Sequence, residues 1–514
     1  MGVVEALLEQ ISVKTTFIVL FVAYGVYSII CRIDEHRRIR RLGRYGPQLK
    51  TYAPWSLDLV ARFVRSTVKH NNLASWRDGI FGPLNSWTAE ARLLGVRTIF
   101  TADPANLKAI LATQFVDYGK GQPFHAEWKD FLGDSIFTTD GPSWHASRQL
   151  IRPQFTRDRV SDLHCFEAHM QTLFKAIANR GPLRGEGQLV DMNNTDGKVL
   201  DISDLFFRYT LDVATEFLLG WDVKSLTTPK QEFAEAFNEV QHIQNIIARV
   251  GKLRHIIPKY RFWRALNTVN HFINFYIERA LRLSPEELAS KTKDDHSYTF
   301  LHALAGFTRD RTVLRDQIIA VLLAGRDTTA ATLSWTLYEL GRYPNAVKKL
   351  RAEIISTLGT ERTPTYEDLK SMSYLKAVLN ETLRLYPAVP FNVRLALKDT
   401  TLPRGGGPDG SEPLPVLKDS PRYLADPQIF SPDRWAHWHP KPHDYIPFNA
   451  GPRICIGQQF ALTEMSYVLV RLFQKFDRVE SQMKDIDGGE PLLKADIVLS
   501  PGQGVKVAFW EAQN

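Results

Sequence analysis

The residues with the clearest chemical potential lie in the stretch FNAGPRICIGQQF, residues 448–460. Cys455 stands between Gly451 and Gly457, Arg453 precedes it by two residues, and a helical pattern follows directly. Glycines allow φ > 0 and let a flat ligand approach closely. A loop that enters a helix N-terminus offers free N–H groups and the positive end of the helix dipole, which stabilise a thiolate. The stretch therefore indicates a metal ligand or a nucleophile rather than a buried apolar cysteine.

A second chemical feature lies inside a long apolar-periodic stretch, residues 312–343. Gly325 costs a helix interior about 1 kcal/mol. The side chains of Asp327, Thr328 and Thr329 compete with the helix for backbone hydrogen bonds. Two interpretations stay open at this point: a kink or solvated face, or a local opening of the helix that leaves a groove with an acid and a hydroxyl beside it.

Helices are expected to position most of the candidate functional residues named above. Pro344 suits the first turn of a helix that stops at Gly359, and Pro387 stops another helix over 374–386. Strand-like stretches are short and sparse, and Pro, Gly and Asp make residues 400–440 read as turns. The predicted strands are residues 91–100, 389–397 and 504–510. The pattern predicts one mainly α domain with a small β portion.

Composition restricts the function classes. The 514 residues carry a net charge of +8, which is too mild a bias to indicate nucleic-acid binding. The cysteines, Cys31, Cys165 and Cys455, are too few for a disulfide framework, and no C-x-x-C pair indicates zinc.

An apolar run precedes an arginine-rich stretch near the N-terminus. Because the positive charge follows the run, and because no A-x-A site appears, we expect an uncleaved anchor rather than a signal peptide. The alternative is a buried helix of the body. The expected parts are a lumenal N-terminus (1–14), a transmembrane anchor (15–31), a basic, proline-containing hinge (32–55) and a catalytic body on the cytoplasmic side (56–514). The short run suits the thin membrane of the endoplasmic reticulum.

The spacing F-x-x-G-x-R-x-C-x-G, from Phe448 to Gly457, resembles the haem-binding signature of cytochrome P450 monooxygenases. Further stretches are similar to motifs of this family in the same order along the chain. They are Trp144–Arg148 (W-x-x-x-R), AGRDTT at 324–329, Glu381–Arg384 (E-x-x-R) and FSPDRW at 430–435. The resemblance covers essentially the whole chain and implies a single-domain cytochrome P450 fold, with residues 56–514 as the haem-thiolate monooxygenase domain.

The resemblance also implies a role for each residue. Cys455 would be the axial thiolate of haem b, Phe448 would shield its sulfur, and Gly457 would let the following helix pass under the porphyrin. Trp144, Arg148, Arg394 and Arg453 would bind haem propionates, and Gly451 completes the signature. Asp327 and Thr328 would manage protons. Glu381, Arg384 and Arg434 would form a structural ion-pair network.

The implied reaction inserts one atom of O2 into a C–H bond. The sequence contains no flavin- or nicotinamide-binding motif, so electrons would come from a separate protein, the NADPH-cytochrome P450 reductase. The stretches 132–155, 402–410 and 444–464 are most similar to the fungal branch that hydroxylates n-alkanes and fatty acids, often at the terminal carbon. The apolar residues 318–325 and 388–392 would suit an aliphatic chain.

Two alternatives stay open. Fungal relatives also act in secondary metabolism, so the protein could be a tailoring oxidase of such a pathway. The segment 411–430 looks shorter than in the family, where a Lys-Gly strand pair, a Tyr and a His-Arg step are expected. That departure raises the second alternative, a reductase-independent isomerase or an inactive haem-binding relative.

Overall fold

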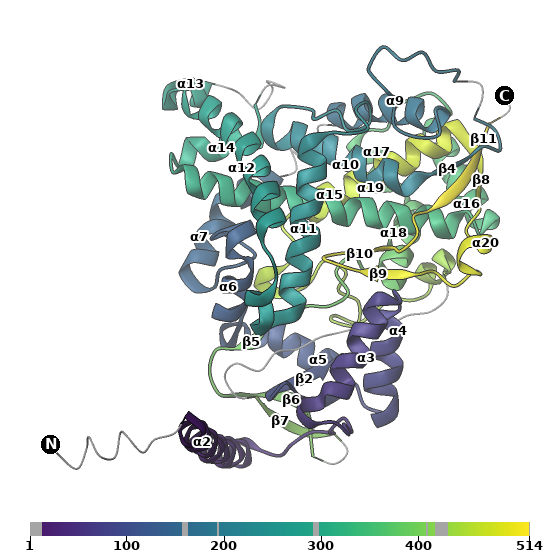
Figure 1. The fold of residues 1–514 in the computed structure, drawn as a ribbon. Coiled ribbons are helices and arrows are strands. Elements are labelled where there is room, and N and C mark those ends of the chain that lie inside the picture. The colour runs from purple at the N-terminus through teal and green to yellow at the C-terminus, as the bar shows by residue number, and fades with distance from the viewer. Residues whose placement is uncertain are drawn as a thin grey trace.

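The computed structural model describes residues 13–156, 163–192, 195–290, 298–407, 410–416 and 430–512. Helices dominate, and the strands gather in small antiparallel sheets at the edges of the helical body (Figure 1). The helices are α2 (Val13–Leu42), α3 (Leu57–Val68), α4 (Asn72–Trp76), α5 (Pro104–Lys108), α6 (Gly121–Leu132), α7 (Gly141–Ile151), α9 (His164–Ala178), α10 (Ile202–Leu219), α11 (Glu232–Val250), α12 (Tyr260–Leu281), α13 (Pro285–Ser290), α14 (Phe300–Phe307), α15 (Arg311–Leu340), α16 (Pro344–Leu358), α17 (Tyr366–Ser371), α18 (Ser373–Leu385), α19 (Gln458–Lys475) and α20 (Lys484–Asp487). The mainly α prediction is confirmed.

The strands pair as four two-stranded sheets and one three-stranded sheet, β4-β11-β8, within the described residues. They are β1 (Thr88–Leu93), β2 (Val96–Thr101), β3 (Tyr118–Gly119), β4 (Val199–Asp201), β5 (Leu395–Ala396), β6 (Thr400–Gly406), β7 (Glu412–Val416), β8 (Phe476–Ser481), β9 (Leu493–Ala495), β10 (Leu499–Pro501) and β11 (Lys506–Glu511). Every strand pair is antiparallel.

Three predictions in the strand regions were wrong in detail. Of the strand predicted over 389–397, only Leu395–Ala396 forms a strand, β5. Residues 91–100 are not one strand but parts of the hairpin β1–β2, which turns at Leu94 and Gly95, both at positive φ. The first part of the 400–440 region, expected as turns, forms the hairpin β6–β7. The prolines and glycines of this hairpin favoured turns in the prediction. They are compatible with strands here, because an edge strand tolerates a proline, which cannot donate a hydrogen bond to a neighbouring strand. Residues 417–429, most of the segment expected to be shortened, lie outside the described residues.

The long helix α15 runs through the middle of the body (Figure 1). Asp310 caps it by accepting hydrogen bonds from the backbone N–H groups of Thr312 at 2.8 Å and Val313 at 3.2 Å. Its first half packs into an apolar core shared with α10, α11, α12 and α14. Its second half packs into another core shared with α9, α18 and α19. Residues 324–329 lie between the two cores, so polar side chains there displace no core packing.

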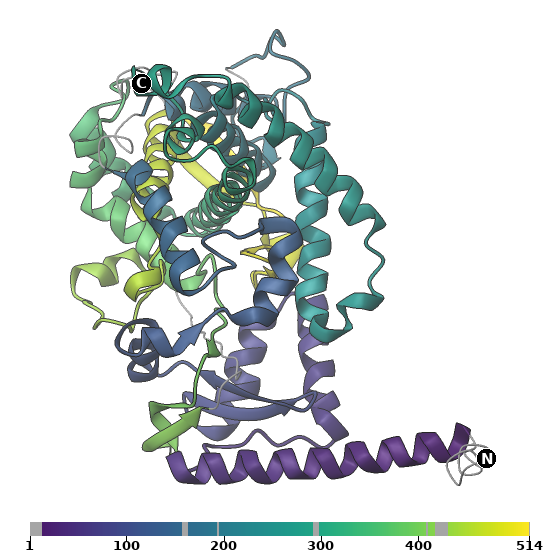
Figure 2. The same ribbon diagram turned by 90° about the vertical axis from the view of Figure 1, so that its left-hand side faces the viewer.

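Helix α2 is the one helix of the described residues that is long and apolar enough to cross a membrane, with a mean hydropathy of 2.0 in its most apolar window. Figure 2 shows it projecting from the base of the body. It continues without a break to Leu42, so the first part of the expected hinge, 32–42, is helical. Of the expected lumenal segment 1–14, residues 1–12 lie outside the described residues.

The last turns of α2 are attached to the body. Arg38 donates to the carboxylate of Asp399 at 2.9 Å, and Arg92 donates to Glu35 at 2.6 Å. Ile39 is fully buried. These contacts place the end of α2 against the small sheets at the base of the body.

Candidate active site

The cysteine loop is a compact turn that delivers Cys455 to the N-terminus of α19. The backbone N–H of Cys455 donates to the carbonyl of Phe448 at 2.9 Å, and this bond closes the loop. The backbone N–H of Gly457 reaches the sulfur. The thiol of Cys455 is exposed. The surrounding protein atoms nevertheless desolvate it and raise its pKa, whereas the hydrogen bond from Gly457 and the cation of Arg148 lower the pKa. The donors are those that a thiolate ligand needs.

Gly451 is required by the backbone. Its φ is +66°, and a Cβ there would lie 1.8 Å from the carbonyl oxygen of Leu111. Gly457 differs: its φ is negative, and a Cβ would meet only the ring of Phe155 at 3.6 Å. The backbone therefore requires a glycine at Gly451, whereas the protein leaves room for a side chain at Gly457.

Cationic side chains converge beside the loop. The short pairing of β3 with β5 brings Lys120 next to Arg394, and both side chains donate to the amide oxygen of Asn392. Arg453 donates to Asp140 at 2.6 Å and lies over the ring of Trp144, 4.7 Å from its centroid. The sequence analysis missed Lys120, although its position between two glycines in YGKG was an available signal.

This cluster has more positive than negative charge. Burial and the neighbouring guanidinium groups lower the pKa of Lys120, and burial with Arg453 lowers the pKa of Arg394 to about 10. Asp140 is the carboxylate that opposes both shifts. Among the described residues, the buried Nε of Arg453 has no hydrogen-bond partner. Three cations around one carboxylate suit a ligand with further carboxylates, which fits the two propionates of haem.

Arg148 and Trp144 also lie at the loop. Arg148 donates to the carbonyl of Ile454 at 3.1 Å, and its guanidinium carbon lies 5.9 Å from the centroid of the Trp144 ring. Trp144 is buried and also contacts the ring of Phe115. In this arrangement Arg148 supports the backbone next to the sulfur.

The acid and the hydroxyl lie on α15 without breaking it. Residues 311–340 form one continuous helix, so both the kink and the local opening of the helix expected from the sequence are wrong. Thr328 donates to the carbonyl of Ala324 at 2.7 Å, as a helical threonine commonly does. A Cβ at Gly325 would meet nothing within 4 Å outside the helix's own backbone, so open space adjoins this part of the helix.

Asp327 is buried rather than solvent-facing. Arg326 lies 3.3 Å from its carboxylate, and Gln241 of α11 hydrogen-bonds it. Burial raises the pKa of Asp327, and Arg326 and Gln241 oppose the shift. Arg326 in turn donates to Asn238 of α11 at 2.7 Å.

The expected ion-pair network is present. Glu381 is fully buried and accepts from Arg384 at 2.9 and 3.0 Å and from Arg434 at 2.9 Å. It also accepts from the backbone N–H of Ser431 at 2.7 Å and the indole N–H of Trp435 at 3.0 Å, two partners that sequence reasoning missed. The network joins α18 to the segment that follows the undescribed residues 417–429.

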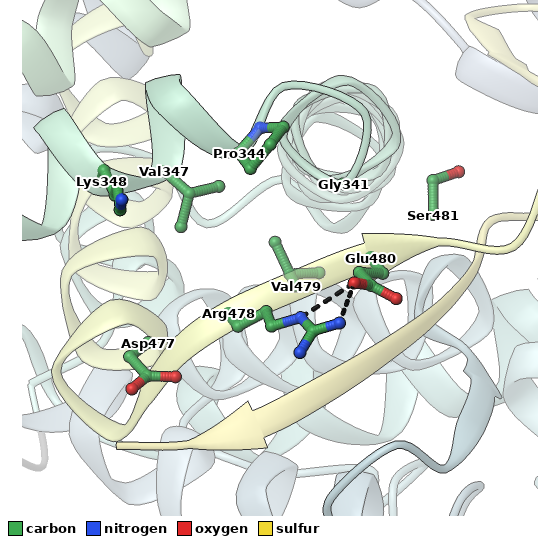
Figure 3. Close-up of a pocket in the computed structure, with 9 residues that line it drawn as sticks. All are labelled: Gly341, Pro344, Val347, Lys348, Asp477, Arg478, Val479, Glu480 and Ser481. Carbon is green, nitrogen blue, oxygen red and sulfur yellow. Dashed lines mark hydrogen bonds and ion pairs between the residues drawn. The ribbon is translucent and has the colours of Figure 1, made fainter. Parts of the chain in front are cut away.

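Figure 3 shows a separate surface pocket of about 400 Å³ at the junction of α15, α16 and β8. Two of its four charged residues, Arg478 and Glu480, pair with each other at 2.8 Å. It shares no lining residue with the cysteine loop or the acid–hydroxyl patch, so we do not assign the chemistry to it.

Comparison with known proteins agrees with this geometry. A family profile described as Cytochrome P450 matches residues 88–504. The chain is 56% identical to "Cytochrome P450 monooxygenase pvhE" of Talaromyces variabilis, covering 99% of this chain and 98% of the relative. It is 40% identical to "Cytochrome P450 52A13" of Debaryomyces hansenii, covering 83% and 84%. It is 41% identical to "Cytochrome P450 52A1" of Candida tropicalis, covering 82% and 80%.

A solved structure with a similar fold is that of the cytochrome P450DA heme domain. The TM-score is 0.71 at 19% identity, covering 92% of this chain and 98% of that one. The match over most of the chain and the high identity to full-length relatives show that this protein is a member of the cytochrome P450 family, an oxidoreductase with cysteine-ligated haem.

Proposed function

We propose that this monooxygenase hydroxylates a hydrophobic aliphatic substrate, a fatty acid or an n-alkane, with the terminal carbon as a favoured position. The observation that carries the proposal is the open space at Gly325, in a part of α15 where the apolar residues Val321 and Ala324 are also only partly buried. An aliphatic chain can fill such a space without leaving polar groups unpaired. The similarity of residues 132–155 and 444–464 to the alkane- and fatty-acid-hydroxylating branch supports the same substrate class.

In the proposed site, Cys455 ligates the haem iron, and Phe448 and Gly457 border the sulfur. Lys120, Arg394 and Arg453 bind the propionates as charge-assisted hydrogen-bond donors. The bound haem supplies activation of O2 and oxidation of the C–H bond. The protein supplies the rest: an oriented thiolate, neutralised carboxylates and a controlled route for protons.

Asp327 and Thr328 form that proton route. Because burial raises the pKa of Asp327, its carboxyl group holds a proton closer to neutral pH than an exposed aspartate does. Gln241 and Arg326 fix its orientation. The Thr328 hydroxyl donates to Ala324, which leaves its lone pairs available to a water on the open side.

The proposed electron donor is the membrane-bound NADPH-cytochrome P450 reductase. Burial lowers the pKa of Arg148 at the cysteine loop, and the nearby Arg152, which is exposed, lowers it further. A positive face above the thiolate suits an acidic partner. We further propose that α2 anchors the enzyme in the endoplasmic reticulum membrane, with the body in the cytoplasm.

A second candidate is oxidation of an aliphatic intermediate in fungal secondary metabolism. The identity of 56% to a relative outside the 52A group exceeds the 40% and 41% to members of that group. Substrate preference can differ between proteins at these identities, since one or two pocket residues change it.

The test is turnover of lauric acid and of a medium-chain alkane by the purified full-length enzyme with the reductase and NADPH. We expect a strongly red-shifted Soret band in the reduced carbon monoxide complex, and hydroxylated product that requires the reductase. No hydroxylated product from either substrate, together with rearrangement of a fatty-acid hydroperoxide in the absence of reductase, would favour the isomerase alternative. A thiolate-type spectrum with no turnover of either substrate would refute the substrate class but not the haem-thiolate centre.

A further inference from the structure

A second group of metal-ligand side chains lies between α9 and α10, outside the haem site. Cys165 and His169 are four residues apart on α9, and Asp212 and Glu216 are four residues apart on α10. Residues at this spacing share one helix face, and the two helices lie side by side (Figure 1). The ligand atoms of Cys165, His169 and Glu216 all lie within 4.8 Å of one another, and those of His169, Asp212 and Asp222 form an overlapping group.

Carboxylates outnumber imidazoles in this group, with Lys224 near Asp222 and His164 near Glu216. One imidazole faces three carboxylates, and its ring nitrogen lies 2.6 Å from a carboxylate oxygen of Glu216. Burial and repulsion from Asp222 raise the pKa of Asp212 to about 6, and burial raises the pKa of Asp222 as well. Burial lowers the pKa of His169, but the hydrogen bond to Glu216 and the nearby acids more than offset this and leave it raised.

The surroundings hold the ligand side chains in place. Asp212 accepts from the backbone N–H groups of Ser225 at 2.7 Å and Leu226 at 3.0 Å, which occupies both of its oxygens. It therefore fixes the loop that carries Asp222 rather than acting as a ligand itself. The ring of His169 packs edge-on against Tyr209. Supporting contacts of this kind orient ligands in metal sites.

We propose that Cys165, His169 and Glu216 bind a zinc ion that joins α9 to α10. Thiolate, imidazole and carboxylate together are typical zinc ligands, and three of them with a water in the fourth position complete a tetrahedral site. Ligand atoms about 2.0–2.3 Å from zinc lie roughly 3.3–3.8 Å apart, so the observed limit of 4.8 Å closes by side-chain rotation. Glu216 is 38% exposed, which gives the ion a path from solvent.

Zinc and haem can be counted separately in the full-length, haem-loaded enzyme. After treatment with a chelator, dialysis against micromolar zinc and removal of the excess, we expect about one zinc per haem. Cys165→Ser and His169→Gln should each reduce the zinc content by about tenfold or more, consistent with the loss of one ligand. Cys31→Ser and His164→Gln are matched controls that should leave it unchanged, since Cys31 lies on α2 and His164 is an exposed neighbour of the cluster.

X-ray absorption at the zinc edge identifies the ligands directly. In the Cys31→Ser background we expect a zinc–sulfur distance of about 2.3 Å, because Cys165 is then the remaining thiol outside the haem site. This measurement decides the question even if the Cys165 variant fails to fold. Zinc bound only through nitrogen and oxygen, or a content unaffected by both cluster substitutions, overturns the proposal. Neither outcome depends on the substrate or on turnover.

Discussion

At the scale of single residues, burial sets the protonation of the groups that matter. Asp327, Asp212 and Glu464 are buried carboxyl groups whose pKa values are raised, and Lys120 and Arg394 are cations whose pKa values are lowered. A desolvated group favours its neutral form. The crowded cations suit a carboxylate-bearing ligand, whereas the raised acids are suited to holding protons.

Thr328→Ala should separate NADPH consumption from product formation. Without the hydroxyl, no side-chain oxygen orients a water beside Asp327, and we expect product per NADPH to fall roughly tenfold or more, since a positioned proton donor contributes about 10²–10⁴. The measurement is the ratio of hydroxylated product to NADPH oxidised. Thr332→Ala is the matched control, because Thr332 makes the same type of bond, to the Thr328 carbonyl at 2.8 Å, one turn along. An unchanged ratio of product to NADPH in Thr328→Ala would show that Thr328 does not act in proton delivery.

Glu127→Gln should flatten the dependence of stability on pH. Burial raises the pKa of Glu127 from 4.5 to about 7, against the opposing charge of Arg254. The folded state therefore binds a proton more tightly than the unfolded state, and this contribution to stability is full below about pH 4.5 and is lost as pH rises through 7. The melting temperature of the variant minus that of wild type should therefore be larger at pH 8 than at pH 5. An equal shift in melting temperature at both pH values would contradict the assignment.

At the scale of elements, the sequence predicted helices better than strands. Residues 312–343 were expected as a helix and form α15, because Asp310 caps it, apolar residues repeat along it and Pro344 prevents its continuation. The hairpin β6–β7 escaped prediction, since its pairing lies between residues whose local preference is for turns. The cluster around Lys120 escaped for a related reason: the pairing of β3 with β5 brings it to Arg394 across more than half of the chain.

The link between α18 and the segment at Pro432–Ala436 should be essential for haem retention. Glu381→Gln keeps the shape of the side chain but leaves Arg384 and Arg434 without their charge partner, and breaking a buried pair costs about 3–5 kcal/mol. We expect most of the protein to lose haem, measured as the ratio of Soret to protein absorbance. Glu353→Gln provides the comparison: Glu353 also contacts α18, at its N-terminus, but is only partly buried. Normal haem content in Glu381→Gln would show that the network does not support the fold.

At the scale of the whole molecule, the catalytic body and α2 meet through a few polar contacts. The pairs Arg38–Asp399 and Arg92–Glu35 are partly exposed, and each such pair contributes about 0–1 kcal/mol. Local sequence could not reveal these contacts, since the arginine-rich stretch predicts only orientation in a membrane. The structure shows that Arg38, one of these arginines, also contacts the body.

Asp399→Ala combined with Glu35→Gln should loosen this attachment without affecting turnover. Loss of both pairs should raise hydrogen–deuterium exchange in residues 36–44 by up to about tenfold in membrane-bound enzyme. Asp34→Ala is the control, because Asp34 lies 3.8 Å from Arg38 on the same helix and does not reach the body. Exchange that rises as much in the control as in the double variant would show that the two pairs do not secure α2.

The continuity of α2 has a mechanical consequence. A helix that crosses a bilayer tilts until its apolar length matches the bilayer thickness. In the anchored orientation proposed above, a change in that tilt would rotate the whole body relative to the lipid surface, because α2 has no break between its apolar part and the turns held against the body. The thickness of the host membrane would then help set which face of the body meets the lipid.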